Sequence, residues 1–280
     1  MPTHTLITAP ALLERLRRGE PLVLLDCGFD LADPAAGARA YAQGHLPGAH
    51  YANLDTDLSG GKTGRNGRHP LPGRDTFAGT VARWGVKPGA AVVCYDDQGG
   101  PYAARAWWML RWLGVDAAAV LDGGKAAWQR AGGTLVAAVP VPASTPPYPL
   151  SAAPAMPTTT ADELLAGLGR TTVIDARAGE RFRGETEPLD PVAGHIPGAR
   201  HRFFKDNLGP DGCFLPAEQL RAAFEVFGGE PAQWVHQCGS GVTACHNLLA
   251  MEHAGLAGSR LYPGSWSEWC ADPSRPVARG

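Results

Sequence analysis

Short apolar runs alternate with stretches of helical spacing along the chain. Four runs have the length and composition of strands: residues 22–26, 90–96, 172–176 and 233–237. The runs 90–96 and 233–237 lack polar alternation, which is typical of strands buried in a parallel sheet. Residues 105–115 and 245–256 have the apolar spacing of helices, and they follow the runs 90–96 and 233–237 respectively. Strands that alternate with helices predict an α/β fold with parallel sheets.

Two further helices are predicted from the residues at their ends. Thr8 and Pro10 are typical of a helix start, and Gly19 is typical of the end of the same helix. Thr160 and Glu163 have the spacing of a capping box, in which each side chain bonds a backbone amide at the helix start. Each helix is followed by a strand-like run, so both halves of the chain open in the same way.

The two halves also repeat one another in detail. The sequence "GHLPGA" at 44–49 returns as "GHIPGA" at 194–199, and "LDGGKAAW" at 121–128 resembles "YPGSWSEW" at 262–269. The offset between the matching segments stays between 141 and 150 residues, which indicates one structural unit used twice. We therefore expect two tandem α/β domains, residues 1–138 and 158–280. His45 and His195 recur in both halves, so we expect them to be structural.

The stretch between the halves is rich in proline, with seven prolines in residues 140–157. Proline removes an amide donor and fixes φ, so neither a helix nor a central strand is expected. We expect residues 139–157 to be an extended, fairly stiff linker between the two domains.

Charge and composition narrow the functional classes. The net charge is −2 and the pI is about 6.5, so there is no overall basic surface for nucleic acid. No apolar run approaches the ~20 residues that a membrane helix needs, and the first residues lack the layout of a secretory signal. Six cysteines form no CxxC pair, which supports neither a zinc site nor a thioredoxin-type motif. We expect a cytoplasmic protein without metal or cofactor, whose cysteines are mostly free and buried.

One cysteine, Cys238, is placed for chemistry at the end of an apolar run, where a glycine-rich turn leads into a helix. Gly239 and Gly241 allow backbone amides to turn inward and form a nest for an anion. The helix N-terminus adds partial positive charge, and both effects stabilise a thiolate or an anionic persulfide. The equivalent residue of the first half is Asp96, so we expect a single site in the second half that faces the first.

Phosphate-ester chemistry also uses a cysteine in an anion-binding loop, but it needs an arginine six residues after the cysteine to clamp the phosphate. Position 244 is an alanine, and residues 239–250 contain no arginine. The sequence therefore argues strongly against a cysteine phosphatase.

Taken together, these motifs resemble the two-domain rhodanese-type sulfurtransferases over nearly the whole chain. The resemblance includes the doubled "GH(L/I)PGA", the proline-rich linker, "DARAGERFRGE" at 175–185, "CGSGVTA" at 238–244 and "GSWSEW" at 264–269. It implies two rhodanese-like domains, the first of them catalytically silent. It also implies a cycle in which Cys238 takes a sulfur from a small-molecule donor as a persulfide and passes it to a thiol, cyanide or a thioredoxin-like protein.

Within this family, "CGSGVT" looks like the branch that uses 3-mercaptopyruvate, whereas the thiosulfate branch resembles Cys-Arg-Lys-Gly-Val-Thr. The resemblance implies a proton relay of Ser240, His69 and Asp55, although Asp57 competes for the role of Asp55. We expect the backbone of the Cys238 loop to contact the substrate, at Gly239, Gly241, Val242 and Thr243. The Thr243 side chain is expected to cap the following helix or to bond the loop.

The substrate arginines depart from the family pattern. The mercaptopyruvate branch offers two arginines to the substrate; Arg181 matches the first, and Asp190 stands at the position of the second. Three other arginines could replace it: Arg183, Arg200 and Arg202. The leading expectation is a 3-mercaptopyruvate sulfurtransferase. Thiosulfate as donor and a non-catalytic persulfide carrier stay open as alternatives.

Overall fold

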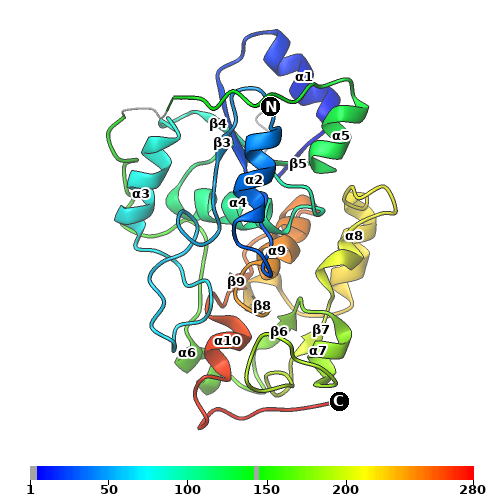
Figure 1. Ribbon diagram of the computed structural model, residues 1–280. Coiled ribbons are helices and arrows are strands. Elements are labelled where there is room, and N and C mark those ends of the chain that lie inside the picture. Colours follow the sequence, from blue (N-terminus) through cyan, green and yellow to red (C-terminus); the bar gives the residue numbers. More distant parts are fainter. Residues whose placement is uncertain (1–4, 142–144) are drawn as a thin grey trace. The chain divides into compact units, whose positions relative to one another are not determined.

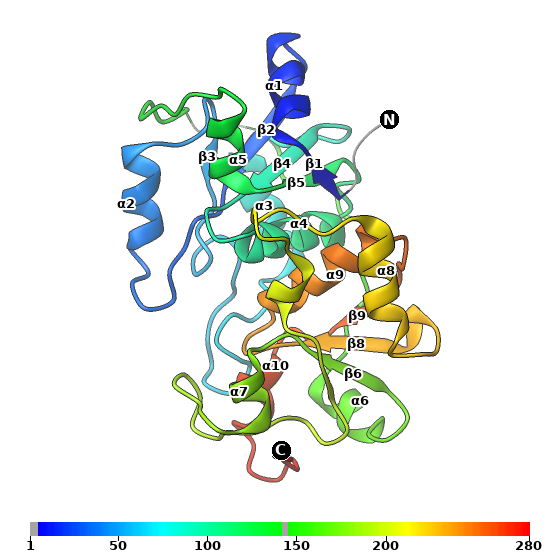
Figure 2. The same ribbon diagram turned by 90° about the vertical axis from the view of Figure 1, so that its right-hand side faces the viewer.

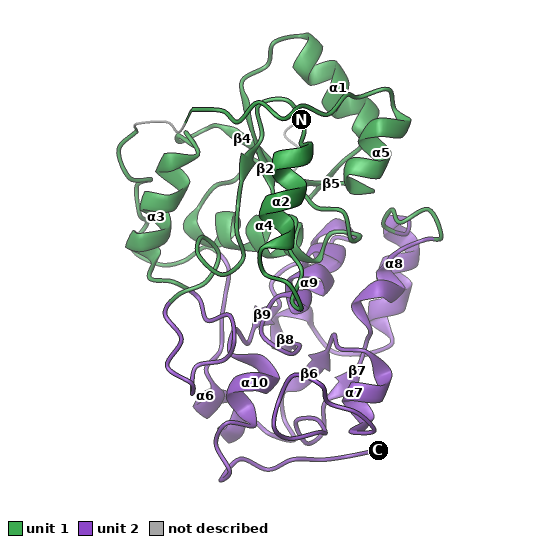
Figure 3. Cartoon of the chain, in the orientation of Figure 1, with its two compact units in different colours: residues 1–60, 72–155, 210–214 green, residues 61–71, 156–209, 215–280 purple. Residues whose placement is uncertain are grey.

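The computed structural model describes residues 5–141 and 145–280 and contains two compact units (Figures 1 and 3). The first unit comprises residues 1–60, 72–155 and 210–214, and the second comprises 61–71, 156–209 and 215–280. Two short segments thus belong to the unit formed by the other half of the chain. One of them, 61–71, brings His69 into the second unit, which contains Cys238.

The first unit is built on a parallel five-stranded sheet with the order β1-β5-β4-β2-β3. Its strands are β1 (Leu6–Ile7), β2 (Leu22–Asp26), β3 (His50–Tyr51), β4 (Ala91–Tyr95) and β5 (Ala118–Leu121). Its helices are α1 (Ala9–Arg17), α2 (Ala36–Gln43), α3 (Arg74–Arg83), α4 (Pro101–Leu113) and α5 (Gly124–Arg130). Side chains alternate between the two faces of each strand. Thus Leu24, Val93 and Leu121 pack with Leu12 of α1 and Trp128 of α5 in one core, and these two helices lie side by side in Figure 1.

The second unit repeats this architecture with a parallel four-stranded sheet, ordered β7-β6-β8-β9. Its strands are β6 (Thr172–Asp175), β7 (Arg200–His201), β8 (Trp234–Gln237) and β9 (Arg260–Leu261). Its helices are α6 (Ala161–Ala166), α7 (Gly179–Arg183), α8 (Ala217–Glu225), α9 (Thr243–His253) and α10 (Ser265–Trp269), with 3-10 turns η1 (Phe204–Asn207) and η2 (Pro231–Gln233). Helices α6 and α10 cover one face, and α8 and α9 cover the other (Figure 2).

The order β5-β4-β2-β3 of the first sheet corresponds, strand for strand, to β9-β8-β6-β7 of the second. Thr158 pairs in parallel with Leu261 where β1 pairs with β5 in the first sheet. The predicted repeat of a parallel α/β unit is therefore confirmed.

The predicted helix ends are also confirmed. The Thr8 side chain accepts a hydrogen bond from the amide of Ala11 at the start of α1, with an N–O distance of 3.4 Å. Thr160 and Glu163 form both bonds of a capping box at the start of α6. These signals succeed because caps act within one turn of the chain and need no tertiary partner.

The doubled "GH(L/I)PGA" motif has the same structural role in each unit. The His45 ring stacks on Tyr41 and the His195 ring stacks on Phe182, with ring centroids 3.9 and 4.0 Å apart. The His45 backbone pairs with Val136, and the His195 backbone pairs with Ala278. Each histidine thus fastens the closing segment of its own unit, as expected for a structural residue.

Outside residues 142–144, which the structure does not describe, the predicted linker 139–157 forms neither helix nor strand. Its first part packs on the first unit. The Tyr148 amide donates to the Ala78 carbonyl, and the Thr145 hydroxyl donates to the Ala82 carbonyl. Among the described residues, no helix has the length and apolar character needed to cross a membrane.

Candidate active site

Cys238 directly follows β8, at the carboxyl end of the strand, and only 2% of its surface is exposed. Its loop is bonded to the start of α10 because the Cys238 amide donates to Oγ of Ser265 and the Cys238 carbonyl accepts from the amide of Trp266. Ser265 has a φ of 53°, in the left-handed region that a serine rarely adopts. Such strain is often found at functional sites, where surrounding contacts hold it in place.

Gly241 is required by both conformation and space. Its φ is 76°, and a Cβ at this position would lie 2.3 Å from the carbonyl oxygen of Pro263. The loop can therefore turn tightly beside the segment before α10 only with a glycine here. The Gly241 carbonyl accepts a hydrogen bond from the thiol of Cys245, at 3.3 Å. This contact gives Cys245 a packing role, and both cysteines are free thiols.

The equivalent loop of the first unit shows what this backbone binds. Asp96 directly follows β4 and lies five residues before α4 begins at Pro101, just as Cys238 follows β8 and lies five residues before Thr243. The Asp96 carboxylate accepts hydrogen bonds from four backbone amides, at 2.8–3.0 Å; they belong to Gln98, Gly100, Tyr102 and Ala103. The loop is thus an anion cradle, and the first unit fills it with its own carboxylate.

Replacing Asp96 by alanine is expected to destabilise the protein by roughly 3 kcal/mol, because it leaves several buried amides without an acceptor. A fall in Tm, measured by circular dichroism, would show the effect. Asp96→Asn is the matched variant, and it should also lower Tm because its amide group places donors against donors. A Tm equal to that of the unmodified protein in both variants would contradict the anion-cradle interpretation.

Ser240 and His69 lie together as the resemblance predicts. His69 Nδ1 is 2.8 Å from Ser240 Oγ, and the two residues are 4% and 5% exposed. Both belong to the second unit because the segment 61–71 packs there. A buried hydroxyl bonded to an imidazole nitrogen can pass a proton in either direction, since each group is both donor and acceptor.

The two aspartates considered for the relay belong to the first unit. Asp55 lies in the turn after β3, where its amide donates to Oδ1 of Asn53 at 2.8 Å. The Asp57 carboxylate accepts from the Asn53 amide and from Arg83, so its interactions stabilise the turn. These bonds weaken the case for Asp57 as a relay residue, and the role of Asp55 stays a prediction.

Arg181 reaches the Cys238 loop from α7. A Cβ placed on Gly239 would lie 3.4 Å from Nη2 of Arg181. The guanidinium is held by Glu187, whose Oε1 accepts from Nη2 at 2.6 Å, and Nη2 also lies 3.4 Å from Oδ2 of Asp190. Glu187 bonds the amides of Leu189 and Asp190 as well, so it fixes this whole turn.

A second arginine near the site is fully committed to structure. Arg177 bonds Asp175, Glu187 and the Gly194 carbonyl. Burial disfavours its charged form, but the two carboxylates outweigh this effect and raise the pKa of Arg177 above its usual value. Arg177 therefore stabilises the structure of the site, and its donors are already used by protein groups.

The three arginines suggested as replacements at the second substrate position are engaged elsewhere. Arg183 pairs with Glu185 at the surface. Arg200 donates to the carbonyls of Val226 and Phe227, and Arg202 donates to the Asp206 carbonyl and the Asn207 side chain.

The expected capping role of Thr243 is also wrong. Val242 is the N-cap residue of α9, and no side chain caps this helix. Thr243 is the first helical residue. In the first unit two amides of the equivalent helix start, those of Tyr102 and Ala103, donate to Asp96.

Arg68 is the site residue that the sequence prediction missed. It precedes His69, and its Nη1 forms an ion pair with Oδ1 of Asp190. A Cβ on Gly239 would lie 2.8 Å from Nη2 of Arg68, closer than from any nitrogen of Arg181. The signal available in the sequence was its position next to a predicted relay histidine. Burial raises the pKa of Asp190 above its ordinary value, although the neighbouring Arg68 favours the carboxylate.

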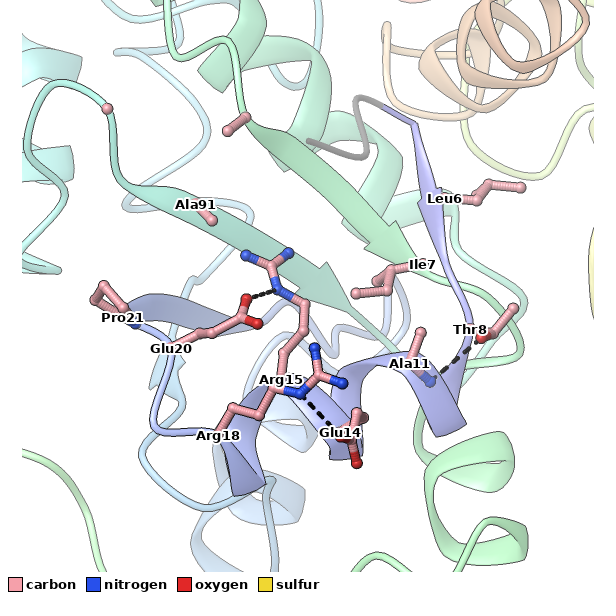
Figure 4. Close-up of a pocket in the computed structure, with 12 residues that line it drawn as sticks. Leu6, Ile7, Thr8, Ala11, Glu14, Arg15, Arg18, Glu20, Pro21 and Ala91 are labelled. Atoms are coloured by element: carbon pink, nitrogen blue, oxygen red, sulfur yellow. Dashed lines mark hydrogen bonds and ion pairs between the residues drawn. The ribbon is translucent and has the colours of Figure 1, made fainter. Parts of the chain in front are cut away.

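The pocket drawn in Figure 4 belongs to the first unit and has a volume of about 860 Å³. It lies at the amino ends of strands, beside Pro21 and Ala91, whereas sites in parallel sheets lie at the carboxyl ends. Its charges are already paired, since Arg15 bonds Glu20 and Arg18 bonds Glu14 (Figure 4). We therefore place the candidate active site at Cys238. In the described parts of the chain, no group of three metal-ligating side chains could hold a metal ion.

Comparisons with known proteins identify the architecture. Residues 8–131 and 160–272 each match the family described as "Rhodanese-like domain". A protein of Pseudomonas aeruginosa designated a probable 3-mercaptopyruvate sulfurtransferase is 50% identical over 287 residues, which is 100% of both chains. SseB of Mycobacterium tuberculosis, provisionally designated a thiosulfate sulfurtransferase, is 42% identical and covers 99% of this chain and 98% of its own.

Solved structures agree with these sequence matches. The 3-mercaptopyruvate sulfurtransferase of Leishmania major superimposes with a TM-score of 0.81 at 31% identity, covering 95% of this chain and 74% of its own. SseA of Escherichia coli, whose structure is described as a 3-mercaptopyruvate sulfotransferase with the rhodanese fold, gives a TM-score of 0.78 at 29% identity. That match covers 93% of this chain and 98% of the other.

Proposed function

Because the chain belongs to the rhodanese-like family and is a two-domain sulfurtransferase, we propose that it takes sulfur from 3-mercaptopyruvate, through a persulfide on Cys238, to a thiol or cyanide acceptor. The observation that carries the choice of donor is the 2.8 Å contact between Ser240 and His69 beside the Cys238 loop. In this proposal residues 158–280 are the catalytic domain, residues 1–138 are the silent domain, and residues 139–157 join them.

The proposed first half-reaction needs one proton to move. The Cys238 thiolate attacks the donor sulfur, the C–S bond breaks, and its electron pair goes to carbon to give the enolate of pyruvate. The proton on the donor thiol must leave that sulfur and reach the enolate carbon, which gives pyruvate and an anionic Cys238 persulfide. Ser240 and His69 are the buried donor–acceptor pair that can carry this proton, with Asp55 orienting His69.

The persulfide is then held by the Cys238 loop of the second unit, which is equivalent to the loop that binds the Asp96 carboxylate in the first unit. In this proposal three of the amides equivalent to those around Asp96 face the Cys238 sulfur; they are the amides of Ser240, Val242 and Ala244. The fourth, that of Cys245, donates to the Val242 carbonyl at 3.0 Å instead. Gly239 and Gly241 give the turn its shape, and Thr243 contributes the start of the helix. An acceptor thiolate or cyanide attacks the outer sulfur, the S–S bond breaks, and the Cys238 thiolate is regenerated.

Charge also favours a carboxylate donor over thiosulfate. Three arginines and three carboxylates lie around the loop: Arg68, Arg177, Arg181, Asp175, Glu187 and Asp190. These charges cancel, so no surplus positive charge attracts a dianion. Thiosulfate would lose sulfite when its S–S bond breaks, with no proton to move, so the Ser240–His69 pair would have no task.

Thiosulfate is the second candidate donor, because two arginines still direct nitrogen atoms toward Gly239 and the 42% identical relative is named for this donor. A thioredoxin-like protein is a candidate acceptor, since it presents a reactive thiol. We also propose a cytoplasmic location, because six free cysteines fit a reducing compartment.

The donor is decided by kcat/KM for 3-mercaptopyruvate and for thiosulfate, measured on the purified protein with one acceptor. We expect 3-mercaptopyruvate to be preferred by at least about tenfold, which corresponds to 1.4 kcal/mol in the transition state. A preference for thiosulfate would reject the donor assignment. Absence of turnover by catalytic amounts of protein with either donor would favour the non-catalytic persulfide carrier.

A further inference from the structure

We propose that Arg68 binds the carboxylate of the donor together with Arg181, and that Asp190 positions both guanidinium groups. This inference rests on the proposed function, because it identifies the groups that would recognise an α-keto carboxylate at the Cys238 site. The family resemblance leads one to expect an arginine at residue 190, but this residue is an aspartate. Its ion-pair partner, Arg68, is the arginine.

The backbone fixes Arg68 beside the Cys238 loop. The Arg68 amide donates to Oγ of Ser267 in α10, with an N–O distance of 3.0 Å. Gly67 has a φ of 84°, and a Cβ there would lie 2.7 Å from the Gly264 carbonyl oxygen. The chain thus lies against the start of α10, which also holds the backbone of Cys238 through Ser265.

Asp190 links the two arginines. Its side chain is only 3% exposed, and one carboxylate oxygen bonds Arg68 while the other lies 3.4 Å from Nη2 of Arg181. The Asp190 amide is fixed in turn by Glu187. A buried carboxylate between two guanidinium groups sets their spacing, because each ion pair is directional.

Both guanidinium groups keep donors for a ligand. Among the described residues, Nη2 of Arg68 and Nη1 of Arg181 have no acceptor, and the side chains are 26% and 17% exposed. Measured from a Cβ placed on Gly239, these nitrogens would lie 2.8 and 3.5 Å away. One donor comes from Arg68 and the other from Arg181, and both lie near Gly239, next to Cys238. Two such donors match the two oxygens of one carboxylate.

The first test replaces Arg68 by glutamine and compares it with Arg183→Gln. Arg183 is the matched control because it lies on the same helix as Arg181 but pairs with Glu185 at the surface. We expect Arg68→Gln to raise KM for 3-mercaptopyruvate by about 10- to 100-fold, the range for a lost charged hydrogen bond, with a much smaller change in kcat. Equal KM values for the two variants would overturn the proposal.

A second pair of variants separates lost binding from an unpaired charge, since Arg68→Gln leaves Asp190 buried without its partner. The double variant R68Q/D190N removes both charges and should keep the raised KM. The exchange R68D/D190R restores a guanidinium to the pair and should bring KM back to within a few-fold of the unmodified protein. A normal KM in R68Q/D190N would overturn the proposal, because the charge left on Asp190 would then explain the single variant.

Inhibition constants for pyruvate and its neutral amide, pyruvamide, keep this inference distinct from the choice of donor. They can be measured with whichever donor the unmodified protein uses. Arg68→Gln should weaken inhibition by pyruvate about 10- to 100-fold and leave inhibition by pyruvamide unchanged. Equal effects on both compounds would reject a carboxylate site at Arg68, whereas failure of 3-mercaptopyruvate as a donor would reject only the proposed function.

Discussion

Replacing Cys238 by alanine is expected to lower kcat/KM by about 10⁴-fold or more with either sulfur donor. In the proposed mechanism the persulfide is a covalent intermediate, and its sulfur has no other attachment point in the loop. The buried site excludes bulk water, and the neighbouring thiol of Cys245 donates to the Gly241 carbonyl. No second thiol in the loop is therefore placed to take over the reaction.

Steady-state turnover and intact-protein mass spectrometry together check this result. The unmodified protein should gain the mass of one sulfur atom when mixed with donor alone, and Cys238→Ala should gain none. Cys213→Ser is the control because Cys213 is half-buried in the segment 210–214 of the first unit. Retained turnover in Cys238→Ala, or its loss in Cys213→Ser, would exclude the persulfide mechanism at Cys238.

Ser240→Ala is expected to lower kcat/KM for 3-mercaptopyruvate by about 10²- to 10⁴-fold, the usual contribution of general acid–base catalysis. Any thiosulfate turnover should change far less, because cleavage of thiosulfate moves no proton. His69→Gln should show the same difference between donors, since His69 is the partner of the Ser240 hydroxyl at 2.8 Å.

The matched control for this prediction is Ser259→Ala. Ser259 is another buried serine of the second unit, and its hydroxyl donates to the Pro231 carbonyl at 2.8 Å. It should leave the ratio of the two donor activities unchanged. If Ser240→Ala lowered both activities equally, the hydroxyl would serve the loop structure and the relay would have to be abandoned.

The sequence by itself determined the repeated α/β architecture, and it placed the proposed nucleophile, Cys238, directly after a strand. The strands at Leu22–Asp26 and Trp234–Gln237 follow from local apolar runs, and the capping box at Thr160 follows from residues three positions apart. Such signals act over a few residues, so they survive any change in the surrounding fold. The equivalence of Cys238 and Asp96, which occupy the same position in the two halves, followed from the internal repeat alone.

Only the tertiary structure decided which charged side chains meet at the site. Arg68 and Asp190 are 122 residues apart in the chain, and no periodicity connects them. Their ion pair depends on the segment 61–71 packing with the second unit and on Glu187 fixing the turn at Asp190. Arg183, two residues from Arg181, pairs with Glu185 at the surface instead, because side-chain direction follows the local backbone. Contact across the fold is set by how distant segments pack.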